Sequence, residues 1–70
     1  MMHENKYLAI YHDLASRIRD GEWKAYDKLP SENELAVRYK TSRETIRKAL
    51  NLLSEHGYIQ KMKGKGSIVL

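Results

Sequence analysis

Two helix-start signals lie ten residues apart near the middle of this sequence and leave almost no chain between two helices. The first is Ser31 followed by Glu34, the spacing of a capping box, in which each side chain accepts a hydrogen bond from the other residue's backbone N–H. The second is Thr41 followed by Glu44, with Ser42 as the alternative N-cap. We therefore expect a short helix, a very tight turn and a second helix.

Apolar residues at helical spacing predict one more helix and the buried faces of all three helices. An amphipathic helix is expected over Lys6–Asp20, with Gly21 placed to end it in a left-handed conformation. The helix that Ser31 opens should end near Lys40, and the one after it at Gly57. The residues expected on the buried faces are Tyr7, Ile10, Tyr11, Leu14, Ile18, Leu35, Ala36, Tyr39, Ile46, Ala49, Leu50 and Leu53.

The remaining segments predict a linker and a β-hairpin. The stretch after Gly21 is too short and irregular for a helix, so we expect a connector with a short strand near Leu29, in which Trp23 and Tyr26 cover the edge of the core. Two strand-like runs then flank a glycine-containing turn. These runs are Tyr58–Met62 and Ser67–Leu70.

The predicted fold class is α+β, mostly α: a winged helix-turn-helix of three helices followed by a two-stranded β-hairpin wing. A chain of 70 residues has room for one core, so residues 1–70 are expected to form a single domain. The sequence has no cysteine and no apolar segment of the length that a membrane span or signal peptide needs. We therefore expect a cytoplasmic protein held together by its core.

Enzymatic chemistry has little support in this sequence. His3, His12 and His56 do not have the spacing of metal ligands relative to one another. There is no cysteine nucleophile and no phosphate-cradling P-loop. We expect no enzyme activity, no metal and no cofactor.

The excess positive charge is concentrated in the last thirty residues. Residues 1–40 hold seven Lys and Arg against seven Asp and Glu, whereas residues 41–70 hold six against two, and the formal net charge is +4. Such an asymmetry favours an anionic partner, and nucleic acid is the commonest partner of that kind. A solvated basic face explains the charge alone equally well.

The second helix of a helix-turn-helix presents its first turns to base edges in the DNA major groove. Arg43 and Arg47 lie there, one turn apart on one side, and each guanidinium can match the two acceptors of guanine, a contact that discriminates by roughly 1 to 3 kcal/mol. Glu44 and Thr45 are further candidates for base contacts. For Glu44 the capping box is the favoured alternative, and for Arg47 the alternative is a solvated helix face.

Phosphate contacts are expected at the starts of both helices, because backbone N–H groups there have no partner within the helix and bind anions. Capping explains most of these positions equally well, and a solvated surface explains the lysine among them. The candidates are Ser31, Glu32, Asn33, Ser42 and Lys48.

The hairpin turn supplies a second basic element. We expect Lys63, Gly64 and Lys65 to enter the minor groove, since glycine lets the backbone approach a narrow surface closely. A soluble exposed turn would have the same composition. A helix-turn-helix combined with a basic wing is stronger evidence than either part, so we predict double-stranded DNA as the partner.

Several segments of this chain resemble the GntR family of bacterial transcription regulators, in particular its HutC branch. The similarity extends over nearly the whole N-terminal winged-helix domain of that family. The opening Lys6–Tyr11 and the wing are most similar to members that regulate trehalose operons. The segments that carry the family resemblance are Leu29–Ala36, Thr41–Leu50, Gly57–Ile59 and Lys63–Ser67.

The resemblance implies the DNA-binding domain of a repressor that recognises half of a palindromic operator. It implies that Arg43 and Arg47 read bases, that Ser42 and Thr45 support them, and that the wing tip at Gly64 enters the minor groove.

Two positions depart from the family pattern. Asn33 stands where some relatives carry a phosphate-contacting arginine, which puts that contact in doubt. Glu44 stands where other members have threonine or another small polar residue, which suggests a part in setting the operator sequence.

The resemblance also implies a longer protein. Such regulators form homodimers largely through a C-terminal effector domain, whereas this sequence stops at Leu70, where the second strand of the wing should end. We expect a fragment whose absent domain binds a sugar phosphate such as trehalose 6-phosphate and so releases the operator. The rival function is a winged helix used for protein–protein docking, which would depend on an exposed apolar patch.

Overall fold

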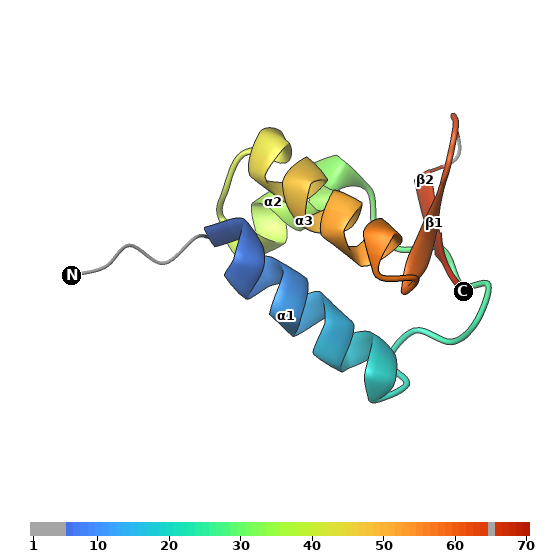
Figure 1. The fold of residues 1–70 in the computed structure, drawn as a ribbon. Helices are drawn as coiled ribbons and strands as arrows, with labels where there is room; N and C mark the ends of the chain where they lie inside the picture. Colours follow the sequence, from blue (N-terminus) through green and yellow to red (C-terminus); the bar gives the residue numbers. More distant parts are fainter. Residues whose placement is uncertain (1–5, 65) are drawn as a thin grey trace.

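The structure is a computed structural model that describes residues 6–64 and 66–70. Three helices precede a two-stranded antiparallel hairpin that stands at one end of the helices (Figure 1). This is the predicted winged helix-turn-helix, mostly helical. The elements are α1 (Lys6–Arg19), α2 (Glu32–Tyr39), α3 (Arg43–Glu55), β1 (Ile59–Met62) and β2 (Gly66–Val69).

The helix ends follow from local chemistry. Gly21 has φ +89°, and its N–H donates to the carbonyl of Ile18 at 3.1 Å, so the left-handed end of α1 is confirmed. The capping box at the start of α2 is also confirmed, with Ser31 Oγ accepting from the N–H of Glu34 and Glu34 Oε1 accepting from the N–H of Ser31. Lys40 ends α2 in a left-handed conformation, at φ +55°.

The N-cap of α3 is one residue later than the favoured prediction. Ser42, not Thr41, has extended backbone, at φ −82° and ψ 159°, and its Oγ accepts from the N–H of Thr45 at 3.1 Å. The N–H of Thr41 instead donates to Ala36 and closes α2. The predicted capping role of Glu44 is therefore wrong, because a box that starts at Ser42 has its third helical residue at Thr45.

The core lies between the three helices and the inner face of the wing. Every apolar residue predicted on α3 is buried there, while the aromatic residues predicted on α1 and α2 are half-buried at its edge. Ala15 of α1 was missed because a small residue adds little to a hydrophobic stripe. The buried residues are Ile10, Leu14, Ala15, Leu29, Leu35, Ile46, Ala49, Leu50, Leu53, Ile59 and Val69.

The linker meets only half of its prediction. Trp23 packs against the core, but Tyr26 is 80% exposed, so its predicted covering role is wrong. The cause is a backbone turn, since Tyr26 has φ +73°, a conformation that non-glycine residues rarely adopt. Over the described residues, no helix has the length and apolar character needed to cross a membrane.

The linker also pairs with the wing, as the expected strand near Leu29 requires. Lys28 forms an isolated antiparallel bridge with Ile68, and the N–H of Leu29 donates to the carbonyl of Ser67 at 2.9 Å. The strands β1 and β2 pair from Ile59 opposite Val69 to the hairpin end, each within one residue of the predicted run. This pairing fixes the wing relative to the start of α2.

Candidate nucleic-acid interface

The exposed face of α3 is determined by its buried face. Ile46, Ala49, Leu50 and Leu53 are packed inward, so Arg43, Arg47 and Asn51, at four-residue spacing, lie together on the solvent side. The structure thus brings both predicted base-reading arginines onto one exposed stripe. Asn51 extends this stripe by another turn. This residue was missed from the sequence, although the four-residue spacing of the two arginines predicts its position on the same face.

Arg47 is joined to the preceding helix through Glu32. Its Nη2 donates to Glu32 Oε1 at 3.2 Å and its Nε to Oε2 at 3.4 Å. The hydrogen bonds from the guanidinium, with the nearby negative charge, raise the pKa of Arg47 above its usual value. The two-point contact fixes the direction of the fork and at the same time turns the Glu32 carboxylate toward α3.

The other predicted contacts at the helix starts differ in availability. The N–H and hydroxyl of Ser31 are both engaged in the capping box, whereas Glu32 and Asn33 occupy the first two helical positions, whose N–H groups have no acceptor within a helix. In α3 the hydroxyl of Ser42 lies 3.0 Å from that of Thr45. Glu44 is exposed beside them, with no part in the cap.

Lys48 is not brought to the arginine stripe. Its Nζ lies 5.8 Å from the ring centroid of Tyr7, so its side chain is directed toward α1. A phosphate contact from this residue would therefore come from the side of α3 that borders α1.

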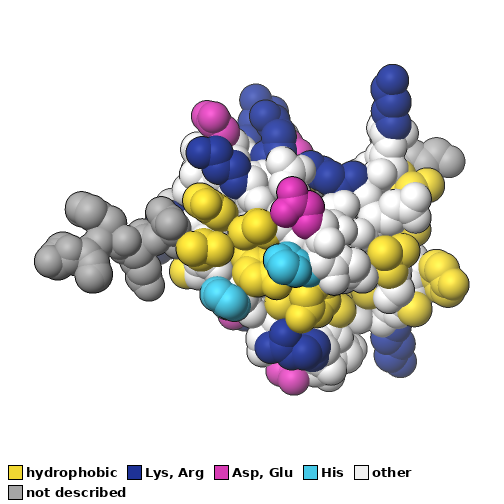
Figure 2. Space-filling view, viewed as in Figure 1, with side chains coloured by type: hydrophobic (Ala, Val, Ile, Leu, Met, Phe, Trp, Pro, Cys, Tyr) yellow, Lys and Arg dark blue, Asp and Glu magenta, His cyan; other side chains and the backbone are white. Residues whose placement is uncertain are grey.

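The wing tip completes the basic edge of the molecule. Lys63 and Gly64 are exposed, and Gly64 has φ +76°, which glycine adopts without strain. Lys65, the third predicted wing residue, lies outside the described residues. Figure 2 shows Lys and Arg side chains along the upper edge of the molecule, over the helices and at the upper end of the wing.

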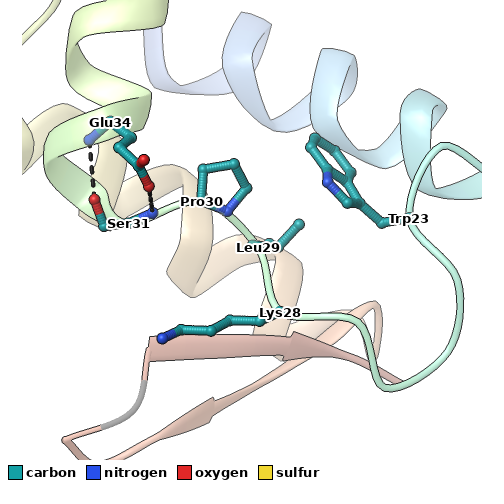
Figure 3. A pocket seen from close by; sticks show the side chains of 6 residues that line it. All are labelled: Trp23, Lys28, Leu29, Pro30, Ser31 and Glu34. Atoms are coloured by element: carbon teal, nitrogen blue, oxygen red, sulfur yellow. Dashed lines mark hydrogen bonds between the residues drawn. The ribbon is translucent and has the colours of Figure 1, made fainter.

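Two further lysines border this edge and were missed from the sequence. Lys61 of β1 donates from Nζ to Asn51 Oδ1 at 2.6 Å and so links the wing to the arginine stripe. Lys28 of the linker lies beside β2 (Figure 3). Both positions depend on strand pairing between distant segments, which charge and spacing along the chain do not show.

An open pocket of about 350 Å³ lies between the linker and the start of α2, and Figure 3 shows the side chains that line it. Its polar side chains are those of Trp23, Lys28 and the capping-box pair, and each side chain of that pair already accepts from the backbone N–H of the other residue. The pocket is thus part of the junction that holds α2 against the linker. It is lined by Trp23, Lys28, Leu29, Pro30, Ser31 and Glu34.

A half-buried cluster fixes α2 against α1. The hydroxyl of Tyr39 donates to Asp13 Oδ2 at 2.6 Å, and Arg17 Nε donates to the same oxygen at 3.0 Å. The hydrogen bond from Tyr39 is the main reason that the pKa of Asp13 is lowered, while burial and this bond raise the pKa of Tyr39 to about 12. This cluster holds the helix that presents Glu32 to Arg47.

Residues 6–69 match the family described as bacterial regulatory proteins, gntR family. The chain is 58% identical over 69 residues to the HTH-type transcriptional regulator TreR of Bacillus subtilis (strain 168), covering 99% of this chain and 29% of TreR. It is 38% identical over 64 residues to the arabinose metabolism transcriptional repressor of Geobacillus stearothermophilus, covering 91% of this chain and 18% of that repressor. The chain therefore spans less than a third of these relatives.

Solved structures show the same fold. A crystal structure of AraR(DBD) in complex with operator ORR3 superposes with a TM-score of 0.91 at 34% identity and covers 100% of this chain and 83% of that one. A transcriptional regulator from Oenococcus oeni gives a TM-score of 0.88 at 26% identity, covering 99% of this chain and 57% of that one.

Proposed function

Because the chain belongs to the GntR family of bacterial regulatory proteins, as its motifs predict, we propose that it is the DNA-binding domain of a transcriptional repressor that recognises half of a palindromic operator. The observation that carries the proposal is the exposed arginine stripe at the start of α3, where Glu32 holds the fork of Arg47. An AraR domain of the same fold that was crystallised with its operator supports it.

Side-chain chemistry supports the following residue roles, together with exposure for those residues that the structure describes. Arg43 and Arg47 read guanine bidentately, and Glu44, with no part in the cap, accepts from cytosine N4. Thr45 contacts a base edge beside Ser42, whose N-cap position lies next to a phosphate. The other proposed phosphate contacts are Ser31, Glu32, Asn33 and Lys48, and the proposed minor-groove residues are Lys63, Gly64 and Lys65.

The same proposal covers the longer protein of which this domain would be a part. TreR and the arabinose repressor are each more than three times as long as the matched segment, which leaves room for a C-terminal effector domain. We propose that this domain forms a homodimer, binds a sugar phosphate of the trehalose 6-phosphate type and so relieves repression of a trehalose operon in the cytoplasm. The high identity to TreR supports the choice of sugar.

Docking to another protein has less support. The exposed large apolar residues are Tyr26 in the linker, Val37 in α2 and Leu70 after β2, with Leu8 of α1 at the limit of exposure. They belong to different elements, whereas several Lys and Arg side chains line the upper edge of the molecule, with others at its lower side (Figure 2).

Fluorescence anisotropy of a labelled mixed-sequence duplex, titrated as salt rises, tests the proposal. If three to five phosphates are neutralised, log K falls against log salt with a slope of about −2.7 to −4.5. Selection from a random duplex pool should then recover one half-site motif. No binding at low salt, or a pool that stays random after selection, would contradict the proposal and bring protein docking forward.

A further inference from the structure

The wing has two faces that carry different lysines. Side chains alternate along paired strands, so residues in one cross-strand row share a face. Lys61 pairs with Ser67, which is 7% exposed and lies next to buried Val69, so this row faces the helices. Lys28 pairs with Ile68, and Ile68 with Gln60, so that row lies on the outer face.

Lys61 is held on the inner face beside α3. Its Nζ lies 2.6 Å from Asn51 Oδ1, on the helical stripe that also carries Arg47. Its ammonium therefore lies between α3 and the wing. A DNA strand that separates a major groove holding α3 from a minor groove holding the wing tip would pass this position.

Lys28 is directed along the outer face toward the wing tip. Figure 3 shows its side chain running beside β2 toward the start of that strand. Its Cε lies 3.3 Å from where a Cβ at Gly66 would stand, so the glycine leaves room for this path. Among the described residues, neither Lys28 nor Lys61 forms an ion pair with a carboxylate.

We infer that Lys28 and Lys61 straddle the minor groove, each neutralising phosphates of a different DNA strand. The inference rests on the proposed function and extends it to two residues and to the strand that each one meets. The minor groove is only about 6 Å wide and is bounded by one strand on either side. A hairpin whose tip enters it therefore has one DNA strand next to each face. Lys61 of the wing lies on one face, and Lys28 of the linker lies on the other.

The arrangement makes the wing a two-sided electrostatic clamp with no requirement for base contacts. Lys61 binds the strand between the two grooves, and Lys28 binds the strand on the far side. The linker takes part in DNA binding through its bridge to β2, which places Lys28 on the outer face, and Gly66 leaves room for the lysine side chain there.

Strand-specific charge removal tests this clamp. Duplexes recovered by selection from a random pool are made with neutral methylphosphonates at the phosphates that flank the minor groove, on one strand or on the other. Anisotropy is measured for the wild type, Lys28→Ala and Lys61→Ala. Each variant should bind the unmodified duplex more weakly and lower the salt slope by about 0.9. Neutralising the DNA strand next to α3 should no longer lower the affinity of Lys61→Ala. Neutralising the opposite strand should no longer lower the affinity of Lys28→Ala.

Lys24→Ala is the matched control, because Lys24 is an exposed lysine of the same linker that lies outside the strand pairing. It should keep the wild-type slope and the wild-type response to both modified strands. Circular dichroism melts of all variants separate lost folding from lost contacts. The clamp would be overturned if Lys28→Ala kept the wild-type salt slope, or if both variants lost their sensitivity to neutralisation of the same DNA strand. Binding by the wild type would still support the proposed function in either case. Failure of the wild type to bind any duplex would instead remove the proposed function itself.

Discussion

The guanidinium of Arg47 lies 3.2 Å from the carboxylate of Glu32, so the side chain proposed to read a base is held by a residue at the start of the preceding helix. Both partners are substantially exposed, at 52% and 33% of their side chains, so the pair adds little to folding stability. Its value lies in orientation, because an arginine fork that is already aligned loses less conformational freedom when it binds guanine.

Arg47→Ala is expected to weaken binding to the selected operator by about 5- to 150-fold, the range of one bidentate base contact. It should also relax the sequence preference at one base pair, because that pair is no longer read. Anisotropy on the operator and on its single-base variants measures both effects. Arg38→Ala is the charge-matched control, because Arg38 of α2 lies near Asp13 of α1 and away from the arginine stripe. This variant should leave the base preference unchanged. A loss that is equal on every sequence would show that Arg47 contacts phosphate.

Glu32→Gln separates orientation from charge. Removing the carboxylate reduces repulsion of DNA, so affinity for a mixed-sequence duplex should rise. The fork of Arg47 is then less firmly held, so the ratio of operator affinity to mixed-sequence affinity should fall. The backbone N–H of residue 32 is unaltered in this variant, which keeps the proposed phosphate contact. A preserved ratio would mean that Glu32 does not position Arg47.

Local sequence patterns predicted those parts of the fold that depend on local interactions. The capping box at Ser31 forms as expected, because both hydrogen bonds lie within four consecutive residues. The α3 stripe is buried as its spacing predicts. The α3 cap is different, because Thr41 and Ser42 are chemically equivalent choices, and the N–H of Thr41 is taken by the end of α2.

Non-local pairing explains what the sequence did not show. Lys28 and Lys61 lie far apart in the chain, and only the bridge to Ile68 and the pairing with Ser67 place them on opposite faces of one wing. The ion pair of Arg47 depends on the angle between α2 and α3, which no spacing rule supplies. Tyr26 is exposed because the left-handed backbone at this residue directs its side chain away from the core.

Ser42→Ala tests which residue begins α3. Loss of an N-cap hydroxyl costs about 0.5 to 2 kcal/mol, and the N–H of Thr45 would lose its acceptor. Urea unfolding monitored by circular dichroism measures the cost. Glu44→Ala removes the side-chain acceptor and should cost less, because Glu44 takes no part in the cap. A larger loss for Glu44→Ala than for Ser42→Ala would restore the capping box that begins at Thr41.

Tyr39→Phe should change how stability depends on pH at both ends of the scale. The folded pKa of Tyr39 is raised to about 12 from 10.0, so its contribution to the free energy of unfolding is present below pH 10 and is lost as pH rises to about 12. The folded pKa of Asp13 is lowered, so its contribution is present above its ordinary pKa and is lost as pH falls through the folded value. Removing the hydroxyl leaves Asp13 without its strongest hydrogen bond, so the variant should be less stable at neutral pH.

The difference in thermal midpoint between wild type and Tyr39→Phe should therefore be largest near neutral pH and shrink toward both extremes. Thermal melts across the pH range measure it, with Tyr26→Phe as the control, because that ring is 80% exposed and should shift no midpoint. A difference that stays constant across pH would mean that the Tyr39 hydroxyl contributes through packing alone and not through its hydrogen bond to Asp13.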